Sequence, residues 1–493
     1  MYVARYQEGS GTCKGSYVRL TPTSSGRDDP YFYSPGRISP RVTIGALPDD
    51  VLLEIFVFCR ASEMHTHWLM TTAWPRMWCR LVHVCKRWRY VVFASPNRLA
   101  VHILCTARTP VREMLNIWPP LPIQVWSPIN AAQDNVIAAL EHRDRICHIC
   151  VYLTRSGYER FVTTMQWRFP GLTSLYLCSQ ETLPALPDTF LGGSAPCIQS
   201  LTLNSIPFPA LPKLLLTSKD LVAIQLWRIP NSGYISPESM ATGLSGLTRL
   251  RSPYINFELA ASSPIHRRRS PLTRAALPSL TTLRFVGGSE YLEDLVARID
   301  APLFQCTDII FFDNLILDLH QLRRFISHSG VLRSFDHAMV TFNHQVTIVL
   351  YQSEGTNPHQ RLELGIDRRE LDAQLSSMAQ LCRQSLSLMS SVEQLDIVSH
   401  HFHSYLQGGT DNARWLELFY PFTAVRALCI SYKLRPFSVS VLQELTGEMA
   451  TEVLPALDNL YLEQYEPYGS EWRAIKSFIA ARQSSSHPVS VHR

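Results

Sequence analysis

The chain has 493 residues, of which 46% are hydrophobic and 18% are charged. The hydrophobic share is enough to bury a sizeable core, and the charged share lies below the usual level of about 25%, which excludes a wholly disordered or coiled-coil chain. The formal net charge is only +5, so the protein as a whole is not a polyelectrolyte suited to neutralising many phosphates.

The sequence shows no targeting or membrane-spanning segment. No stretch approaches the roughly 18 uninterrupted apolar residues of a membrane helix, and the segment Met1 to Ser10 lacks a secretion-signal pattern. The 12 cysteines are scattered through apolar segments, as at Cys59, Cys178 and Cys429, rather than spaced as in a small disulfide-rich module. We therefore expect reduced cysteines, a location in the cytoplasm, the nucleus or both, and no membrane partner.

A leader and a small helical unit open the chain. Residues 1–43 are rich in Gly, Pro, Ser and Thr without a sustained apolar period, so we expect them to be disordered. From Leu47 onward Pro48 suits a first helical turn, and the apolar residues of 51–56 share one helical face. Apolar residues recur at helical spacing again in 81–92. Two or three small helices fit into residues 46–98.

One apolar pattern recurs through the rest of the chain: apolar, two others, apolar, one other, apolar. Its middle position falls on Ile149, Leu175, Leu201, Ile224, Leu250, Leu283, Ile309, Phe335, Leu362, Leu395, Leu428 and Leu460. Successive spacings lie between 23 and 33 residues, and this near-constant spacing indicates a structural repeat. The rows at Leu250, Phe335 and Leu362 each have a polar residue at one apolar position, so the remaining nine are the stronger ones.

Helical segments lie between the rows, as at 236–238 and 291–299, so each repeat is a strand followed by a helix or turn. Such units cannot bury their apolar faces alone and stack into a curved solenoid with a parallel sheet. The sequence thus predicts an α/β fold with a small all-α module at 44–98, a connector at 99–145, the solenoid at 146–483 and a flexible tail at 484–493.

Two segments of the helical unit resemble an F-box. Leu47–Phe56 starts with Leu-Pro and ends with Ile-Phe, and Val84–Val91 carries Val-Cys-Lys-Arg-Trp. The whole chain resembles the F-box proteins with leucine-rich-repeat-like C-terminal regions of mushroom-forming (basidiomycete) fungi. That likeness is carried by Thr109–Leu115, Asp188–Ser194, Gly233–Glu238 and Ser289–Pro302.

The turn residues depart from the usual leucine-rich repeat, which has Asn or Cys three residues after the last strand leucine. Gln180, Ile206 and Ile229 occupy that position here, and only Asn314 fits. We therefore expect an irregular solenoid.

The resemblance implies a non-catalytic substrate adaptor of an SCF-type (Skp, cullin, F-box) ubiquitin ligase. The F-box would dock on a Skp-family adaptor, and through it on a cullin, while the solenoid would bind a protein substrate. By match to the motif, the docking surface or the core behind it is formed by Leu47, Pro48, Leu52, Ile55, Phe56 and Trp88. The alternative is a ligase-independent, protein-binding or chromatin-associated scaffold that uses the solenoid alone.

Residues beside the buried positions of each row should face the open inner surface of the solenoid. The candidates for the substrate surface are Tyr176, Trp227, Arg249, Arg251, Arg284 and Tyr461. Aromatic and arginine side chains often anchor protein interfaces, so this mixed surface fits a protein better than a nucleic acid. Alternatively, Trp227 and Tyr461 merely cover neighbouring turns.

Several other features have plainer interpretations. The basic residues between Arg76 and Arg98 favour an acidic protein partner or a solvated helix face over nucleic acid, because no base-stacking arrangement accompanies them. Cys147 and Cys150 lie on opposite faces of a strand, which disfavours a metal or redox site. The histidines of 400–403 are typical of a loop cluster, and the basic loop at 267–270 could instead hold a phosphorylated serine.

The chain lacks the motifs of the common enzyme classes. It has no phosphate-binding loop, nucleophile elbow or helical His-Glu zinc motif. The sequence predicts no catalytic residue, no cofactor and no bound metal.

Overall fold

The structure is a computed structural model that covers most of the chain. It describes residues 44–64, 81–95, 101–117, 120–129, 131–258, 274–312, 319–328, 335–353, 360–367, 371–399, 413–431, 442, 452–462 and 470–492. The leader at 1–43, the histidines of 400–403, the basic loop at 267–270 and Asn314 lie outside these ranges.

One long sheet of 16 strands dominates the described part of the chain. The strands of the molecule are β1 Val101–Leu104, β2 Ile123–Ser127, β3 Ile146–Leu153, β4 Ser174–Ser179, β5 Ser200–Asn204, β6 Ala223–Ile229, β7 Ser252–Phe257, β8 Ala275–Ala276, β9 Thr282–Gly287, β10 Ile299–Asp300, β11 Cys306–Phe311, β12 His337–Phe342, β13 Val346–Tyr351, β14 Arg361–Ile366, β15 Gln394–Ser399, β16 Ala427–Ile430, β17 Asn459–Leu462 and β18 Ser490–His492. Strands β8 and β10 form a separate parallel pair.

Helices connect most of these strands. They are α1 Asp49–Met64, α3 Lys86–Phe93, α4 Val111–Ile117, α5 Gln133–Leu140, α6 Arg155–Thr164, α7 Leu211–Leu215, α8 Pro237–Leu244, α9 Ser289–Ala297, α10 His320–His328, α11 Leu371–Gln384, α12 Leu386–Met389, α13 Ala413–Phe419 and α15 Ser470–Ser484. Short 3₁₀ turns occur at Ile44–Ala46, Arg143–Arg145, Phe190–Gly193 and Asn231–Gly233. Among the described helices, none is both long and apolar enough to cross a membrane.

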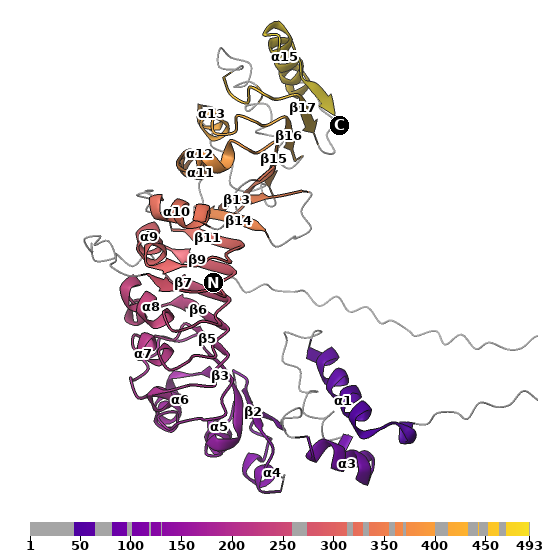
Figure 1. The fold of residues 1–493 in the computed structure, drawn as a ribbon, viewed down its shortest axis with the longest axis vertical. Helices are drawn as coiled ribbons and strands as arrows, with labels where there is room; N and C mark the ends of the chain where they lie inside the picture. Colours follow the sequence, from indigo (N-terminus) through magenta and orange to yellow (C-terminus); the bar gives the residue numbers. More distant parts are fainter. Residues whose placement is uncertain are drawn as a thin grey trace, which may run out of the picture.

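The first eight strands follow the order of the chain. They run β1-β2-β3-β4-β5-β6-β7-β9, and each pairs in parallel with its neighbours. Figure 1 shows helices α5 to α9 stacked along one side of these strands, which leaves the opposite side of the sheet open. This arrangement confirms the predicted solenoid of strand-helix units behind a small helical module.

The second eight strands depart from chain order. They run β11-β14-β13-β12-β15-β16-β17-β18, and β13 is antiparallel to both β12 and β14. After β11 and α10 the chain enters the sheet at β12, which lies three positions away from β11. The next two strands, β13 and β14, fill the gap in turn, so that β14 pairs with β11. The predicted parallel sheet is confirmed, and the antiparallel strand β13 is the one departure from it among the described strands.

A single row of side chains crosses all sixteen strands in register, and every member is buried except the half-buried Val491 of β18. It consists of Ile103, Val125, Ile149, Leu175, Leu201, Ile224, Pro253, Leu283, Thr307, Leu362, Leu350, Ala338, Leu395, Leu428, Leu460 and Val491. Most members are apolar because one face of every strand packs against the connecting helices.

Nine of the twelve predicted repeat centres lie in this row, and three do not. The row position that was assigned to Leu250 belongs to Pro253, and Thr307 and Ala338 replace Ile309 and Phe335. Leu250 and Phe335 are buried but precede their strands. An apolar side chain in the turn before a strand was mistaken for one within it.

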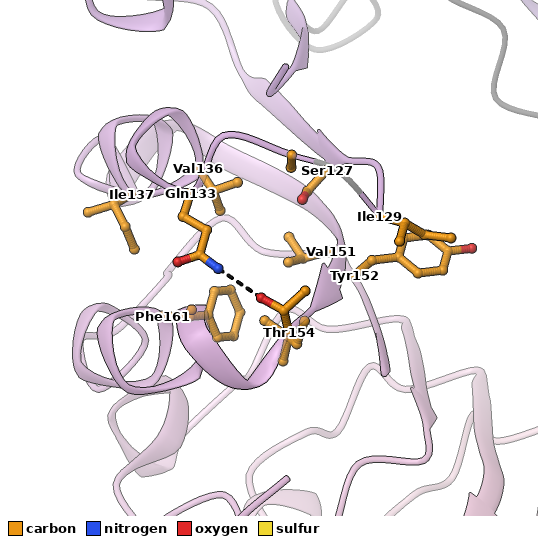
Figure 2. A pocket seen from close by; sticks show the side chains of 12 residues that line it. Ser127, Ile129, Gln133, Val136, Ile137, Val151, Tyr152, Thr154 and Phe161 are labelled. Atoms are coloured by element: carbon orange, nitrogen blue, oxygen red, sulfur yellow. Dashed lines mark hydrogen bonds between the residues drawn. The ribbon is translucent and has the colours of Figure 1, made fainter. Parts of the chain in front are cut away.

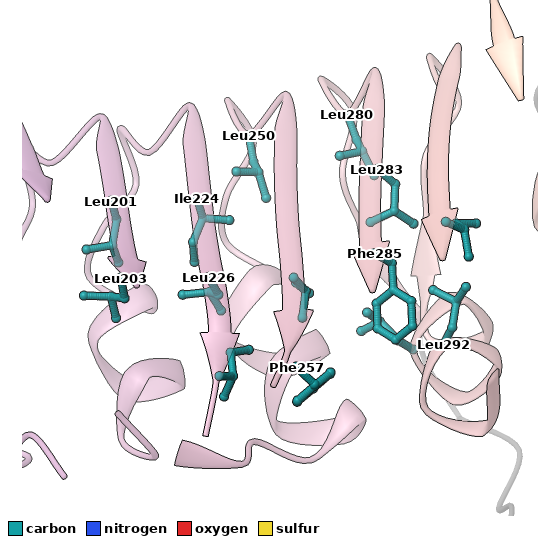
Figure 3. Close-up of a cluster of buried hydrophobic side chains, with 14 of the residues drawn as sticks. Leu201, Leu203, Ile224, Leu226, Leu250, Phe257, Leu280, Leu283, Phe285 and Leu292 are labelled. Carbon is teal, nitrogen blue, oxygen red and sulfur yellow. The ribbon is translucent and has the colours of Figure 1, made fainter. Parts of the chain in front are cut away.

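The core lies between the sheet and the helical side. Figure 3 shows Leu201, Leu203, Ile224 and Leu226 from neighbouring strands in one layer of side chains, with Leu292 of α9 in the same cluster. Each of these side chains is at most 3% exposed. Because strand side chains alternate between faces, this layer fixes which residues of each strand remain on the open face.

Seven of the described strands, β5, β6, β9, β11, β15, β16 and β17, begin with the same backbone arrangement. The N–H groups of Gln199 and Ser200 both donate to the carbonyl of Thr173, at 2.7 and 3.1 Å. The pairs Thr281 with Thr282 and Asp458 with Asn459 likewise share the carbonyls of Arg251 and Arg426. In these seven repeats the shared acceptor turns the chain into its strand at the same point.

The sheet extends beyond the range 146–483 expected from sequence. Strands β1 and β2 lie in the expected connector, 99–145, and pair with β3 through β2. At the other end β18 lies in the expected tail, 484–493, and pairs with β17.

The missing turn residue of the repeat has a local substitute in β4. The hydroxyl of Ser179 donates to the carbonyl of Leu153 at 3.0 Å and accepts the N–H of Glu181 at 3.0 Å. Ser179 is 1% exposed. Ser179, at the end of the strand, thus forms hydrogen bonds with backbone groups of the turn, as the asparagine of a usual leucine-rich repeat would do.

Candidate protein-binding surfaces

The helical module closes around a small core. Leu52 and Phe56 of α1 are 0% and 2% exposed, and Phe56 packs on the ring of Trp88 in α3 with 4.7 Å between ring centroids. Leu47 and Ile55 are half-buried, and Pro48 is exposed. The six residues predicted for docking therefore divide: Leu52, Phe56 and Trp88 hold the two helices together, and Pro48 lies at the surface.

The side chain of Arg87 in α3 links this helix to the start of α1 through hydrogen bonds. Its guanidinium donates to the carboxylate of Asp49 at 2.8 Å, to the carbonyl of Gly45 at 2.6 Å and to the carbonyl of Leu47. The thiol sulfur of Cys85 accepts the N–H of Trp88 at 3.4 Å and caps α3. Arg89 Nε also donates to the carbonyl of Val82 at 3.0 Å. Two residues of the basic stretch thus have structural roles, while Arg76, Arg80 and Arg98 lie outside the described residues.

The module leaves large apolar side chains in contact with solvent. Phe58 and Tyr90 are 73% and 69% exposed, Val84 is 58% exposed, and Val51 is 39% exposed. A module this small can barely close a core, and exposed apolar surface on its described helices is a candidate for a protein contact.

The open face of the sheet carries rows of side chains that are mostly half-exposed or exposed, although Cys150, Thr202 and Val349 are buried. The middle row, in strand order, is Leu104, Trp126, Cys150, Tyr176, Thr202, Gln225, Tyr254, Arg284, Asp308, Glu363, Val349, Met339, Asp396, Cys429, Tyr461 and His492. Three of the predicted substrate-surface residues, Tyr176, Arg284 and Tyr461, lie in this row. Trp227 lies two residues beyond it in β6.

Aromatic pairs line this face. The ring centroids of Trp227 and Tyr254 are 4.1 Å apart, and those of Tyr152 and Tyr176 are 6.1 Å apart. Trp227 is 38% exposed, and its indole N–H donates to the side-chain oxygen of Gln225 at 3.3 Å. Trp227 therefore packs on a neighbouring strand rather than covering a turn.

Strand β6 contains a β-bulge directly after Trp227. The pairing of β6 with β7 shifts register between Leu226 and Ile229, and Arg228 has a φ of 48°. Such a positive φ is strained for an arginine. The guanidinium of Arg228 donates to the side-chain oxygen of Asn204 at 3.2 and 3.3 Å. The bulge thus places Trp227 and Arg228 next to each other on the open face.

The charges of the face are unevenly distributed. Strands β1 to β7 and β9 contain no Asp or Glu, whereas β11, β14 and β15 contain Asp308, Glu363 and Asp396. Arg284 Nε lies 3.9 Å from Asp308 Oδ2. Burial raises the pKa of Asp308 above its ordinary value, and the charge of Glu363 raises it further. The boundary between the two parts falls between β9 and β11.

Arg249 and Arg251 lie elsewhere than predicted. Both precede β7, in the turn after α8, because the repeat centre of this strand is Pro253 and not Leu250. Arg249 Nη1 pairs with Asp220 Oδ1 at 2.9 Å. The residue that occupies the middle row in β7 is Tyr254. Sequence reasoning missed Tyr254 and Arg228. Tyr254 was missed because the repeat centre had been placed at Leu250. Arg228 was missed because its position on the face depends on a bulge, which the spacing of apolar residues does not reveal.

A small cavity lies beside the sheet near β3. It has a volume of about 30 Å³ and is lined mainly by apolar residues of β3, α5 and α6. That volume holds a water molecule or two rather than a substrate. Figure 2 shows Gln133 reaching across it to Thr154, and the Gln133 Nε2 to Thr154 Oγ1 distance is 2.8 Å.

The two cysteines of β3, Cys147 and Cys150, differ in burial. Cys150 is buried, and burial raises the pKa of its thiol to about 12; Cys147 is half-buried and donates to the carbonyl of Ile123 at 3.4 Å. Burial lowers the pKa of His148 between them to about 4. Within the described ranges, no group of three or more His, Cys, Asp or Glu residues could hold a metal ion.

Comparison with known proteins identifies the helical module. The family model of the F-box-like domain matches residues 44–103, a range that contains α1 and α3 and reaches into β1. No curated protein sequence matches the chain significantly. An F-box-like domain therefore precedes the solenoid.

Among solved structures, the leucine-rich repeat-containing protein LegL7 from Legionella pneumophila is similar to this chain. The identity is 12%, and the match covers 76% of this chain and 97% of that chain with a TM-score of 0.27. The solenoid assignment rests on the strand register of this protein and not on that likeness.

Proposed function

We propose that the chain is a substrate-recruiting adaptor of an SCF-type ubiquitin ligase. The observation that carries the proposal is the F-box-like domain at 44–103, since F-box domains generally bind Skp1-type adaptors. It is joined to a solenoid whose sheet has one open face with aromatic and arginine side chains. The ubiquitin transfer itself would take place on other subunits, which this non-catalytic chain would bring to its substrate through a cullin.

In this proposal the two regions have separate tasks. The exposed part of the helical module, around Pro48 and Val51, would contact the Skp-family adaptor, while Leu52, Phe56 and Trp88 keep the two helices in place. The open face of the sheet would bind a protein substrate. The complex would act in the cytoplasm, the nucleus or both, and the sequence likeness to the F-box proteins of mushroom-forming fungi stays a prediction about the origin of the chain.

The docking assignment can be tested by co-purification of the tagged full chain with a Skp-family adaptor. We expect Leu47→Ala combined with Pro48→Ala to reduce recovery of the adaptor at least about tenfold, because truncation of an apolar anchor at an interface costs more than about 1 kcal/mol. Trp167→Ala is the matched control, since Trp167 is 60% exposed on the solenoid. Full recovery with the double variant, at unchanged far-ultraviolet circular dichroism, would refute the assignment.

A ligase-independent scaffold, cytoplasmic or chromatin-associated, is the alternative. It is favoured by the large open sheet, which could bind a partner without any help from the helical module. Mass spectrometry of material that co-purifies with the wild-type chain separates the two functions. The adaptor function requires a Skp-family protein and a cullin in that material, and the scaffold function requires the partner of the solenoid without a cullin.

A further inference from the structure

The sheet face around the β6 bulge has the features of a constructed binding site. Trp227 is held by Tyr254 and Gln225, and Arg228 is held by Asn204 in a strained backbone conformation. β-Bulges and strained non-glycine residues concentrate at functional sites, where they redirect side chains. Here the bulge turns two consecutive residues of one strand toward the open face.

The charge of this area is positive and poorly compensated. Arg228 bonds to the neutral amide oxygen of Asn204, and Arg284 reaches its carboxylate partner only at 3.9 Å. The strands from β1 to β9 on this face contribute no carboxylate. Glu258, which directly follows β7, is exposed and forms no ion pair with Arg228 in the described structure. Two guanidinium groups thus flank an aromatic pair of the exposed Trp227 and the half-buried Tyr254.

We propose that the sheet face around Trp227, Arg228, Tyr254 and Arg284 binds an Asp- or Glu-rich peptide segment that carries a bulky apolar side chain. The apolar side chain would pack on the Trp227–Tyr254 pair, and carboxylates on either side of it would pair with Arg228 and Arg284. The inference rests on the proposed role of the solenoid as the substrate-binding part, and it names the chemical class of that substrate.

A long polyanion fits this face less well than a short acidic segment. Binding of nucleic acid requires many cations along the path of the phosphates. The next strands, β11 and β14, present Asp308 and Glu363 instead. The positive area is bounded by negative charge on that side, so an acidic stretch of limited length followed by neutral or basic residues is the complementary ligand.

The experiment uses the purified full chain without any ligase subunit. A random peptide library displayed on phage is selected on the wild-type chain, and the most enriched sequence is then synthesised with a fluorophore for anisotropy titrations. We expect enrichment of Asp and Glu around an aromatic or aliphatic residue, and binding that weakens with added salt. Arg228→Gln with Arg284→Gln should weaken the Kd about tenfold or more, and Trp227→Ala should do the same.

Matched variants separate a site from a general effect. Arg323→Gln changes an exposed arginine of α10, and Trp167→Ala changes an exposed tryptophan on the solenoid outside the face; both should leave the Kd within about twofold. Asp308→Asn should hold or tighten binding, because it removes a carboxylate that competes for Arg284. Replacement of the peptide's Asp and Glu by Asn and Gln should abolish binding.

Three outcomes would overturn the inference: no enrichment or enrichment of basic peptides, a Kd that is unchanged in the Arg228 and Arg284 variant, or binding only to a phosphoserine version of the peptide. The result is independent of adaptor docking. The Leu47→Ala, Pro48→Ala chain should bind the peptide as the wild type does, so failure here and failure to co-purify an adaptor are distinguishable.

Discussion

The two halves of the long sheet are built from the same kind of strand but are connected differently. In the first half every strand pairs with the strand that precedes it in the chain, whereas in the second half the chain passes two positions and returns through β12, β13 and β14. The first half has no carboxylate in its strands, and the second half has three.

The two halves differ in whether their contacts join only neighbouring repeats or also segments that are far apart in the chain. A solenoid in which every unit contacts only its neighbours has a stability that is close to a sum over units and interfaces. The returning strands tie β11 to β14 and β12 to β15 across long stretches of chain. We therefore expect the second half to open as a larger cooperative unit than any single repeat of the first half, and the three predictions below test that comparison.

The largest effect should come from Glu293, at the boundary between the halves. This side chain of α9 is 2% exposed and accepts the backbone N–H groups of Gln321 and Leu322 in α10, both at 2.8 Å. Glu293→Ala leaves the buried N–H of Leu322 and the part-buried N–H of Gln321 without an acceptor. It should therefore lower the free energy of unfolding by about 3 kcal/mol. Hydrogen exchange should accelerate in β12 to β14 and stay slow in β3 to β6.

Glu290→Ala is the control for that variant. Glu290 is exposed in the first turn of the same helix, so its removal should cost only a few tenths of a kcal/mol. Equal acceleration of exchange in both halves of the sheet would show that the halves are not separate cooperative units.

A smaller effect should follow from Gly243, which lies within the first half. A Cβ at this position of α8 would lie 2.9 Å from the Cα of Pro212 in α7 and 3.1 Å from its carbonyl oxygen. Gly243→Ala should therefore cost about 1 to 2 kcal/mol, since the clash with backbone exceeds the gain in helix propensity. Denaturant titration measures the loss, and exchange should accelerate near α7 and α8 only.

Gly246 provides the matched control in the same repeat. A Cβ there meets nothing within 4 Å, so Gly246→Ala should be nearly neutral. Faster exchange in β12 to β15 with Gly243→Ala would contradict nearest-neighbour coupling in the first half.

The smallest effect concerns the charge difference between the halves. The pKa of Asp308 in the folded state is raised by burial and by Glu363, so the folded state binds this proton more tightly than the unfolded state. The ionised form then opposes folding above the raised pKa, and stability increases as the pH falls through that pKa. Asp308→Asn should be slightly more stable than the wild type at neutral pH, and the difference should vanish in acid. A difference that grows in acid would refute the assignment.

The apolar spacing predicted much of the fold because one face of every strand is buried. Where the row position is Leu175, Leu201 or Leu428, a pattern of apolar residues finds it. Where it is Thr307 or Ala338, the pattern selects a nearby larger side chain. Strand β13 was missed for another reason: an antiparallel return of a few residues has no repeat spacing, so periodicity carries no signal for it.

The residues of the open face were predicted in part. Trp227 and Arg284 follow from alternation along a strand whose buried positions are known. Arg249 and Arg251 failed because alternation was counted from Leu250, which lies before β7. Arg228 could not be found, since its exposure depends on a register shift between two strands that are distant in sequence.

The hairpin of β12 and β13 also bears on how such a sheet changes in length. If both strands are removed, the remaining order around them is β11, β14, β15, which is chain order, and all three run parallel. The hairpin thus adds two strands to an otherwise regular array without reversing the strands on either side of it. A sheet of this kind can be lengthened by less than a whole strand-helix unit.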